Sequence, residues 1–241
     1  MQTRFLGTIL NTVAVIVGSL IGLAFANVLP ASWQSVALTG LGLVTFILGV
    51  KMALQSRNML IVAGSIAVGG ILGAALGISP ALASLAEQVR HSVGGGGRFT
   101  EGLLTTTLLY CVGPMTIMGC LQDGLEGKID ILAMKSLLDG IASVFFAAAL
   151  GVGVLVSAVA VFIVQGALTL LAKRLSKLAD NEEAMAELTG VGGALLLCIG
   201  LGLAEIKHIP TETYLPALIL APVAVIIGQR WGNRQAQNRP N

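Results

Sequence analysis

Lys135 and Asp139 carry the strongest indication of chemistry in this sequence. They lie four residues apart in the apolar run at residues 131–150, so a helix places them on one face, and Ser143 continues that face by one turn. An ionised side chain in the middle of a bilayer costs about 2.5–3.5 kcal/mol on insertion scales, so it is retained when it is paired or functional. Two interpretations stay open: an i,i+4 ion pair whose lysine reaches the membrane interface, and the polar lining of a path for a solute or a proton.

A helix breaker lies in the middle of the run at residues 102–121. Pro114, which follows Gly113, has no amide proton, and its ring displaces the carbonyl group of Tyr110. Freed carbonyl groups at membrane depth can coordinate a cation or hold water, whereas a simple proline kink has only a packing role. The sequence leaves both interpretations open.

Further polar residues lie in the apolar runs or at their ends. Asp123, with Gln122 before it, can cap a turn, bind a basic partner such as Lys135, or gate a vestibule. Asn11 and Gln165 are interpreted as interhelical hydrogen-bonding groups, a common role of neutral polar side chains in membranes. The candidate pathway residues are Asn11, Gly113, Pro114, Gln122, Asp123, Lys135, Asp139 and Ser143.

The residue types of metal sites and catalytic groups are not spaced for either role. Cys111 and Cys120 are nine residues apart, about 180° around a helix, and Cys198 is far from both in the sequence. His91 and His208 are isolated and lack metal-ligand spacing. No Ser-His-Asp order, glycine-rich phosphate loop or HExxH motif occurs. We therefore expect no metal, no cofactor and no enzyme activity.

The elements that position these residues follow from the composition. Of 241 residues, 55% are hydrophobic and 11% are charged, and the mean hydropathy is +0.89. A soluble domain has roughly 25% charged residues, so this chain lacks the polar surface that water requires, and the lipid bilayer is its expected partner. Nucleic acid is excluded as a partner, because 14 basic residues against 12 acidic ones leave no excess of positive charge for phosphates.

Runs of about 20 apolar residues, the length of helix that crosses about 30 Å of hydrocarbon, recur along the chain. Continuous runs favour helices over the alternating strands of a barrel, so we predict an all-α polytopic bundle of about eight membrane helices. The range is seven to nine, because only Gly151-Val152-Gly153 separates the fifth run from the sixth. Residues 1–241 form one predicted integral membrane domain. The runs lie at residues 6–25, 36–54, 59–78, 102–121, 131–150, 153–172, 186–204 and 213–229.

The basic residues predict the orientation of this bundle. With eight helices, Arg90, Arg98 and Lys207 fall on one side and all other basic residues on the opposite side, and cytoplasmic loops keep such an excess. Both termini are therefore predicted to be cytoplasmic, and the segment from Ser79 to Phe99 is predicted to be an external loop. The first run is too long for the apolar part of a signal peptide and is kept as a helix. The cytoplasmic set is Arg4, Lys51, Arg57, Lys128, Lys135, Lys173, Arg174, Lys177, Arg230, Arg234 and Arg239.

An L-T-G-x-G motif opens both the second and the seventh run, at residues 38–42 and 188–192. Because an offset of five helices is odd, the two copies run in opposite directions, and extending the match pairs helices one to three with helices six to eight as an inverted repeat. The alternative is a chance coincidence of residues that are common in membrane helices. An inverted repeat favours a transporter or channel, because oppositely inserted halves can exchange inward-open and outward-open packings.

Small residues predict where helices contact one another. Gly69, Gly73 and Gly77 repeat every four residues on the third run, and Gly18 and Gly22 do so on the first, so each set forms a stripe that lets backbones approach. The stripes can face the same chain or a second copy, so a homo-oligomer is one partner that they allow.

Several short segments together resemble a known family. They are Gly7-Thr8-Ile9-Leu10-Asn11-Thr12, Cys111-Val112-Gly113, Gln122-Asp123-Gly124-Leu125, Lys135-Ser136-Leu137-Leu138-Asp139-Gly140 and Leu215-Pro216-Ala217. Over nearly its whole length the chain is similar to the YqgA/YdfK-like family of bacterial inner-membrane proteins, a domain of unknown function numbered five-five-four. The resemblance implies a multi-pass protein of the bacterial cytoplasmic membrane, and it implies no substrate.

Two functions are consistent with these features. The first is a transporter or channel-like permease for a small solute or ion, with Asp139 as the pathway carboxylate and Lys135 as its charge partner. The alternative is a non-transporting scaffold or accessory subunit that assembles through glycine-rich helix faces, in which the same pair only locks two helices. Convergence of Asn11, Gly113, Asp123, Lys135 and Asp139 on one water-accessible cavity would favour the permease, and scattered positions would favour the scaffold.

Overall fold

The structure, a computed structural model, describes residues 5–26 and 30–237, and in these residues it contains helices and no strand. The prediction of an all-α bundle is therefore confirmed. The elements are α1 (Leu6–Ala26), α2 (Ala31–Ala53), α3 (Met59–Ala75), α4 (Ile78–Val93), α5 (Phe99–Cys111), α6 (Pro114–Glu126), α7 (Asp130–Leu150), α8 (Gly153–Leu170), α9 (Ala172–Ala179), α10 (Glu182–Leu203), the 3-10 helix η1 (Thr211–Tyr214) and α11 (Ala217–Gln237).

Within the described residues, six helical segments are long and apolar enough to cross a membrane. Two further pairs pass the same test together but are bent, by 59° between α3 and α4 and by 62° between α5 and α6. When each bent pair counts as one span, the total is eight, the number that the apolar runs predict. The lipid-facing surface agrees with this, since apolar side chains such as Leu137 and Ile141 on α7 are 61% and 52% exposed.

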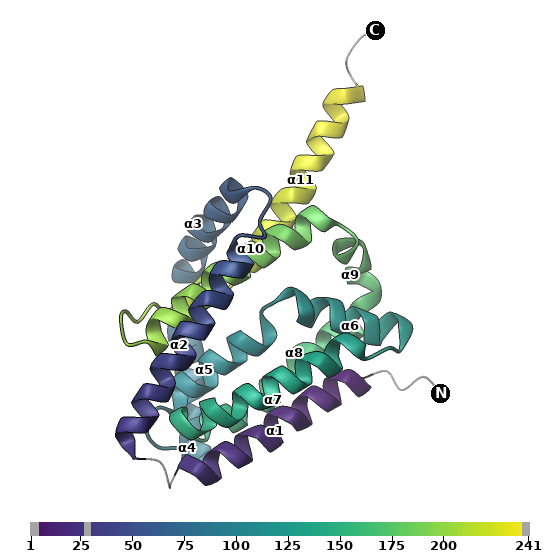
Figure 1. Cartoon of the computed structure of the whole chain (residues 1–241). Helices are drawn as coiled ribbons and strands as arrows, with labels where there is room; N and C mark the ends of the chain where they lie inside the picture. Colours follow the sequence, from purple (N-terminus) through teal and green to yellow (C-terminus); the bar gives the residue numbers. More distant parts are fainter. Residues whose placement is uncertain (1–4, 27–29, 238–241) are drawn as a thin grey trace.

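The helices form two groups that diverge from the corner where α1 ends and α2 begins (Figure 1). In the first group, α1 packs along α7 and α8, and α5 and α6 pack against α8. In the second group, α2 packs along α10, and α3 packs against α11. One hydrophobic cluster joins the two groups, because Leu108 of α5 and Phe146 of α7 pack in it with Leu38 of α2 and Leu196 of α10.

Glycine contacts show the direction in which packed helices run. A Cβ atom on Gly18 of α1 would overlap the backbone of Gly140 on α7, and one on Gly22 would overlap the backbone of Val144. The residue numbers rise together, so α1 and α7 are parallel. In a chain whose eight spans alternate in direction, the first and fifth spans are also expected to be parallel. The same contacts show that the stripe at Gly18 and Gly22 faces a helix of the same chain.

The contact between α2 and α10 has the two-fold pattern that an inverted repeat requires. A Cβ atom on Gly42 would meet Gly200, one on Gly49 would meet Gly193, and the helices are therefore antiparallel. The offset of 151 residues that takes Gly42 to Gly193 also takes Gly49 to Gly200, so exchange of the two helices reproduces the same contacts. The two copies of the L-T-G-x-G motif are offset by 150 residues, one residue out of this register, and the inverted repeat stays a prediction.

Two expectations about the third run and the segment that follows it are wrong. Residues 79–93, predicted as part of a loop, belong to the helix α4. Gly77 does not continue the contact stripe, because it lies in the break between α3 and α4 with a φ of +63°, where its added Cβ would meet only Pro80, at 3.7 Å. Gly69 and Gly73 do contact other helices, since a Cβ atom on Gly69 would overlap the backbone of Ala217 at the start of α11 and one on Gly73 would overlap that of Thr213 in η1.

Candidate functional site

A buried ion pair lies inside the first group of helices. Lys135 Nζ is 2.6 Å from Asp139 Oδ2, and each residue is only 7% exposed. Asn11 of α1 donates a hydrogen bond of 3.0 Å from its Nδ2 to the same carboxylate oxygen. The face of α7 that the spacing predicts as polar is therefore turned into the protein, and Asn11, predicted as an interhelical hydrogen-bonding group, provides its second donor.

Tyr110 and Ser143 extend this network towards α5. Ser143 Oγ donates to the carbonyl oxygen of Asp139 at 2.7 Å, and the Tyr110 hydroxyl lies 2.9 Å from Ser143 Oγ. Lys135 Nζ lies 5.9 Å from the centre of the Tyr110 ring, within range of a cation–π interaction. From the sequence, Tyr110 was expected only to lose its carbonyl hydrogen bond to the ring of Pro114. Its hydroxyl in an apolar run was the signal that could have added it.

The proline interrupts the helix rather than kinking it. Helix α5 ends at Cys111, and Pro114 begins α6 as its first residue. Gly113 between them has φ +155° and ψ 155°, a conformation essentially restricted to glycine. The displaced carbonyl group of Tyr110 is not left free, because Thr116 Oγ1 donates a hydrogen bond of 3.0 Å to it. The carbonyl oxygen of Tyr110, one predicted ligand for a cation or water, therefore already accepts a hydrogen bond from a protein side chain.

Gln122 and Asp123 lie at helix ends and do not join the ion pair. Asp123 Oδ2 accepts a hydrogen bond of 3.0 Å from the backbone N–H of Gly7, in the first turn of α1. Gln122 Oε1 accepts one of 3.3 Å from the backbone N–H of Ile131, in the first turn of α7. A carboxylate is favourable beside a helix N-terminus, where the backbone N–H groups and the helix dipole are positive. Of the three roles predicted for Asp123, the structure shows the capping one.

A second buried carboxylate, which the sequence analysis missed, performs the same task in the other group. Glu187 of α10 is 1% exposed and accepts hydrogen bonds from Ser56 Oγ at 2.5 Å and from the N–H groups of Arg57 and Asn58 at 2.9 and 2.7 Å. These donors precede α3, so Glu187 ties the start of α3 to α10. The available signal was an acidic residue near the start of an apolar run.

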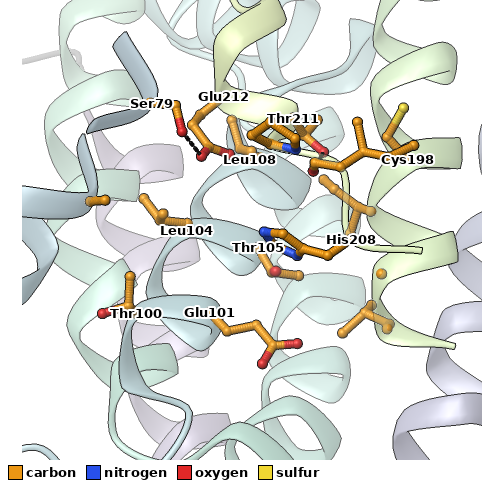
Figure 2. Close-up of a pocket in the computed structure, with 16 residues that line it drawn as sticks. Ser79, Thr100, Glu101, Leu104, Thr105, Leu108, Cys198, His208, Thr211 and Glu212 are labelled. Atoms are coloured by element: carbon orange, nitrogen blue, oxygen red, sulfur yellow. Dashed lines mark hydrogen bonds between the residues drawn. The ribbon is translucent and has the colours of Figure 1, made fainter. Parts of the chain in front are cut away.

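A cavity of about 400 Å³ opens between α4, α5, α10 and η1. Figure 2 shows Glu212 and Ser79 at one end of it and Glu101 at the other, with the side chain of His208 between them. Ser79 Oγ donates to Glu212 Oε1 at 2.6 Å. Arg98 holds Glu101 through two hydrogen bonds of 2.6 and 2.8 Å, and this interaction raises the pKa of Arg98. The sequence analysis did not predict this cavity, because its walls come from four segments that are distant in the chain.

The structure therefore brings together some of the predicted pathway residues and separates others. Asn11, Lys135, Asp139 and Ser143 form one network. Gly113 and Pro114 form the helix break that follows Tyr110, and Gln122 and Asp123 cap helices. Of the five residues predicted to converge in a permease, Asn11, Lys135 and Asp139 are therefore together, whereas Gly113 and Asp123 have other contacts.

The sequence was compared with known proteins. The family described as "Protein of unknown function (DUF554)" matches residues 6–226. The chain is 32% identical over 232 residues to "Uncharacterized membrane protein YdfK" of Bacillus subtilis (strain 168), with 95% of this chain and 99% of that protein covered. It is 28% identical over 222 residues to "Uncharacterized protein YqgA" of Escherichia coli (strain K12), with 90% and 94% covered. No solved structure matches.

Proposed function

The chain belongs to the DUF554 family, and from that premise we propose that it is a permease for a small solute or an ion in the bacterial cytoplasmic membrane. The observation that carries the proposal is the ion pair of Lys135 and Asp139, buried between spans and hydrogen-bonded by Asn11. Charged groups inside a membrane bundle are costly and commonly mark the path of an ion or a substrate. The proposal assigns no catalytic step, metal or cofactor.

The position of the network beside a broken helix supports a path. Discontinuous membrane helices in transporters place polar backbone next to the substrate site near the middle of the bilayer. Here the break at Gly113 follows the helix that carries Tyr110, and Tyr110 contacts Ser143 in the network. The cavity at the other end of α5 would be the external entrance. Leu108, which lines that cavity, also packs in the hydrophobic cluster that joins the two helix groups, and it would form part of the barrier between entrance and network.

The glycine contacts favour this proposal over a self-assembling scaffold. The stripes at Gly18 and Gly22 and at Gly69 and Gly73 lie against backbone of the same chain. They are therefore not free to pack a second copy, which was the main sequence argument for the scaffold. A scaffold in which the ion pair only locks α1 to α7 remains the alternative that the experiment below distinguishes.

The experiment is a flux assay with purified protein in liposomes. Candidate ions and solutes are screened with the wild type, and the active one is measured with Asp139→Asn and with Asp130→Asn. Asp130 is exposed at the start of the same helix and provides a matched control for the loss of a carboxylate. We expect Asp139→Asn to reduce the flux to the level of empty liposomes and Asp130→Asn to retain it.

Undiminished flux in Asp139→Asn would remove Asp139 from the mechanism. A wild type that moves nothing in the screen, although Lys135 and Asp139 are strongly coupled in stability, would support the scaffold instead.

A further inference from the structure

Two contacts show how α1 and α8 are aligned relative to each other. Thr8 Oγ1 of α1 lies 3.3 Å from Thr169 Oγ1 of α8, and Val15 and Val161 pack in one hydrophobic cluster. The residue numbers rise on one helix as they fall on the other, so the helices are antiparallel. The segment between these two contacts is the level at which the ion pair approaches α1.

Each of the two helices carries one buried amide side chain in that segment. Asn11 follows Thr8 by three residues and Gln165 precedes Thr169 by four, so each lies one turn further along the face that contacts the other helix. Both residues are 0% exposed. Asn11 and Gln165 are therefore buried at neighbouring levels of α1 and α8, in the interior of the first helix group.

The amides are not satisfied by the protein. Oδ1 of Asn11 and both Nε2 and Oε1 of Gln165 are buried without a hydrogen-bond partner. Because Nδ2 of Asn11 donates to Asp139, its Oδ1 is an acceptor that still lacks a donor or a cation. Buried polar atoms without a partner are rare and point to a bound group.

The charges and atom types along this interior define what the bound group would be. Asp139 is paired with Lys135, and Asp123, which caps the first turn of α1, adds a second carboxylate. Asp123 contacts Gly7, one helical turn from Asn11, so this carboxylate and the unpartnered Oδ1 of Asn11 lie along the same stretch of α1. The formal charges of Asp123, Asp139 and Lys135 sum to −1, and two of the three unpartnered amide atoms are oxygens, so this interior favours a cation over an anion.

The ligand set further indicates the class of cation. Among the described residues, no group of three or more His, Cys, Asp or Glu could hold a metal ion, so a transition metal does not fit this region. Neutral amide and hydroxyl oxygens suit a hard cation, and the formal charge of −1 left by Asp123, Asp139 and Lys135 balances a single positive charge.

We propose that Thr8, Asn11, Gln165 and Thr169 form a binding site for a monovalent metal cation between α1 and α8. The site deepens the proposed function and rests on it, because the bound cation would be an ion that the permease moves. Asn11 is one of these four residues and also donates a hydrogen bond to Asp139, so a bound cation would directly change the surroundings of the ion pair.

The test measures thermal unfolding of the detergent-solubilised protein in NaCl and in choline chloride of equal ionic strength. A ligand at about 100 times its dissociation constant should raise the Tm of a chain of this size by roughly 5–10 °C. We expect such a shift with Na⁺ for the wild type and no shift for Gln165→Leu. Ser157→Ala changes another buried polar residue of α8, one that already bonds Val154, and should keep the shift.

Gln165→Leu should remain folded, because it replaces unsatisfied amide atoms with an apolar group of similar size; Thr169→Val provides a second variant that should also lose the shift. Equal shifts with Na⁺ and K⁺ would support the site as one for alkali cations in general. No difference between Na⁺ and choline in the wild type, or a shift that persists in both variants, would overturn it. Binding without any flux would reject the permease and keep the site, whereas flux that is independent of Na⁺, together with no shift, would reject the site and keep the permease.

Discussion

At the scale of single residues, the ion pair is the feature whose removal should have the largest effect. Asp139 accepts from Lys135 and Asn11, so the carboxylate has two donors in a place where water is excluded. A buried pair adds little net stability, because desolvation opposes the attraction, but loss of one partner leaves an unpaired buried charge. Replacing one partner should therefore destabilise the protein much more than replacing both partners with apolar residues.

We expect Lys135→Met and Asp139→Leu each to destabilise the protein by roughly 3–5 kcal/mol, and the double variant to cost clearly less than the sum of the two. The measurement is a double-mutant cycle on unfolding in detergent. The exposed pair of Lys128 and Glu126, with an N–O distance of 2.9 Å, provides a control cycle that should show no measurable coupling. Additive effects at positions 135 and 139 would contradict this account.

At the scale of elements, close backbone approach decides which helices pack. A Cβ atom on Gly73 of α3 would overlap the carbonyl oxygen of Thr213, whereas one on Gly64 of the same helix would meet nothing within 4 Å. Both glycines lie inside α3, so the change in helix propensity on substitution is the same for both. A difference in stability between alanine variants at these two positions therefore measures the contact of α3 with Thr213, in the segment that precedes α11.

Gly73→Ala should destabilise the protein by about 1–3 kcal/mol, the usual cost of overpacking. Gly64→Ala should be neutral or stabilising by up to about 1 kcal/mol, because alanine is the better helix former. Thermal unfolding of the two variants in one detergent compares them directly. Equal stability of Gly73→Ala and Gly64→Ala would contradict a contribution of the close contact between Gly73 and Thr213 to the packing of α3.

At the scale of the whole molecule, the count of spans decides where the ends lie. Eight spans place the start of α1 and the end of α11 on one side, and Figure 1 shows both ends away from the corner between α1 and α2. The excess of basic residues predicts that this side is the cytoplasm. Arg4 and Arg239 of that set lie outside the described residues. If α5 and α6 did not cross together, the segments on either side of them would share a compartment.

Single cysteines introduced into a variant without Cys111, Cys120 and Cys198 test this arrangement. Gly96→Cys should react with a membrane-impermeant thiol reagent added to intact cells, and Lys128→Cys should react only after the cells are opened. Both positions are exposed in the structure, so access to the reagent depends on the side of the membrane. Labelling of both in intact cells would contradict a crossing by α5 and α6.

The membrane setting, the helical fold, the eight apolar runs and the polar face of α7 could be predicted from the sequence alone. These depend on composition and on a period of 3.6 residues, which are properties of short segments. The sequence did not reveal α4, because a short amphipathic helix lacks the long apolar run that was counted.

The contacts between side chains of different helices could not be predicted in this way. Asn11 bonds Asp139 across 128 residues, Asp123 bonds Gly7 across 116 residues, and the walls of the cavity come from distant segments. Helices in lipid choose their neighbours by close packing and hydrogen bonding, not by burial from water, so hydrophobic patterning marks each span without marking its partner.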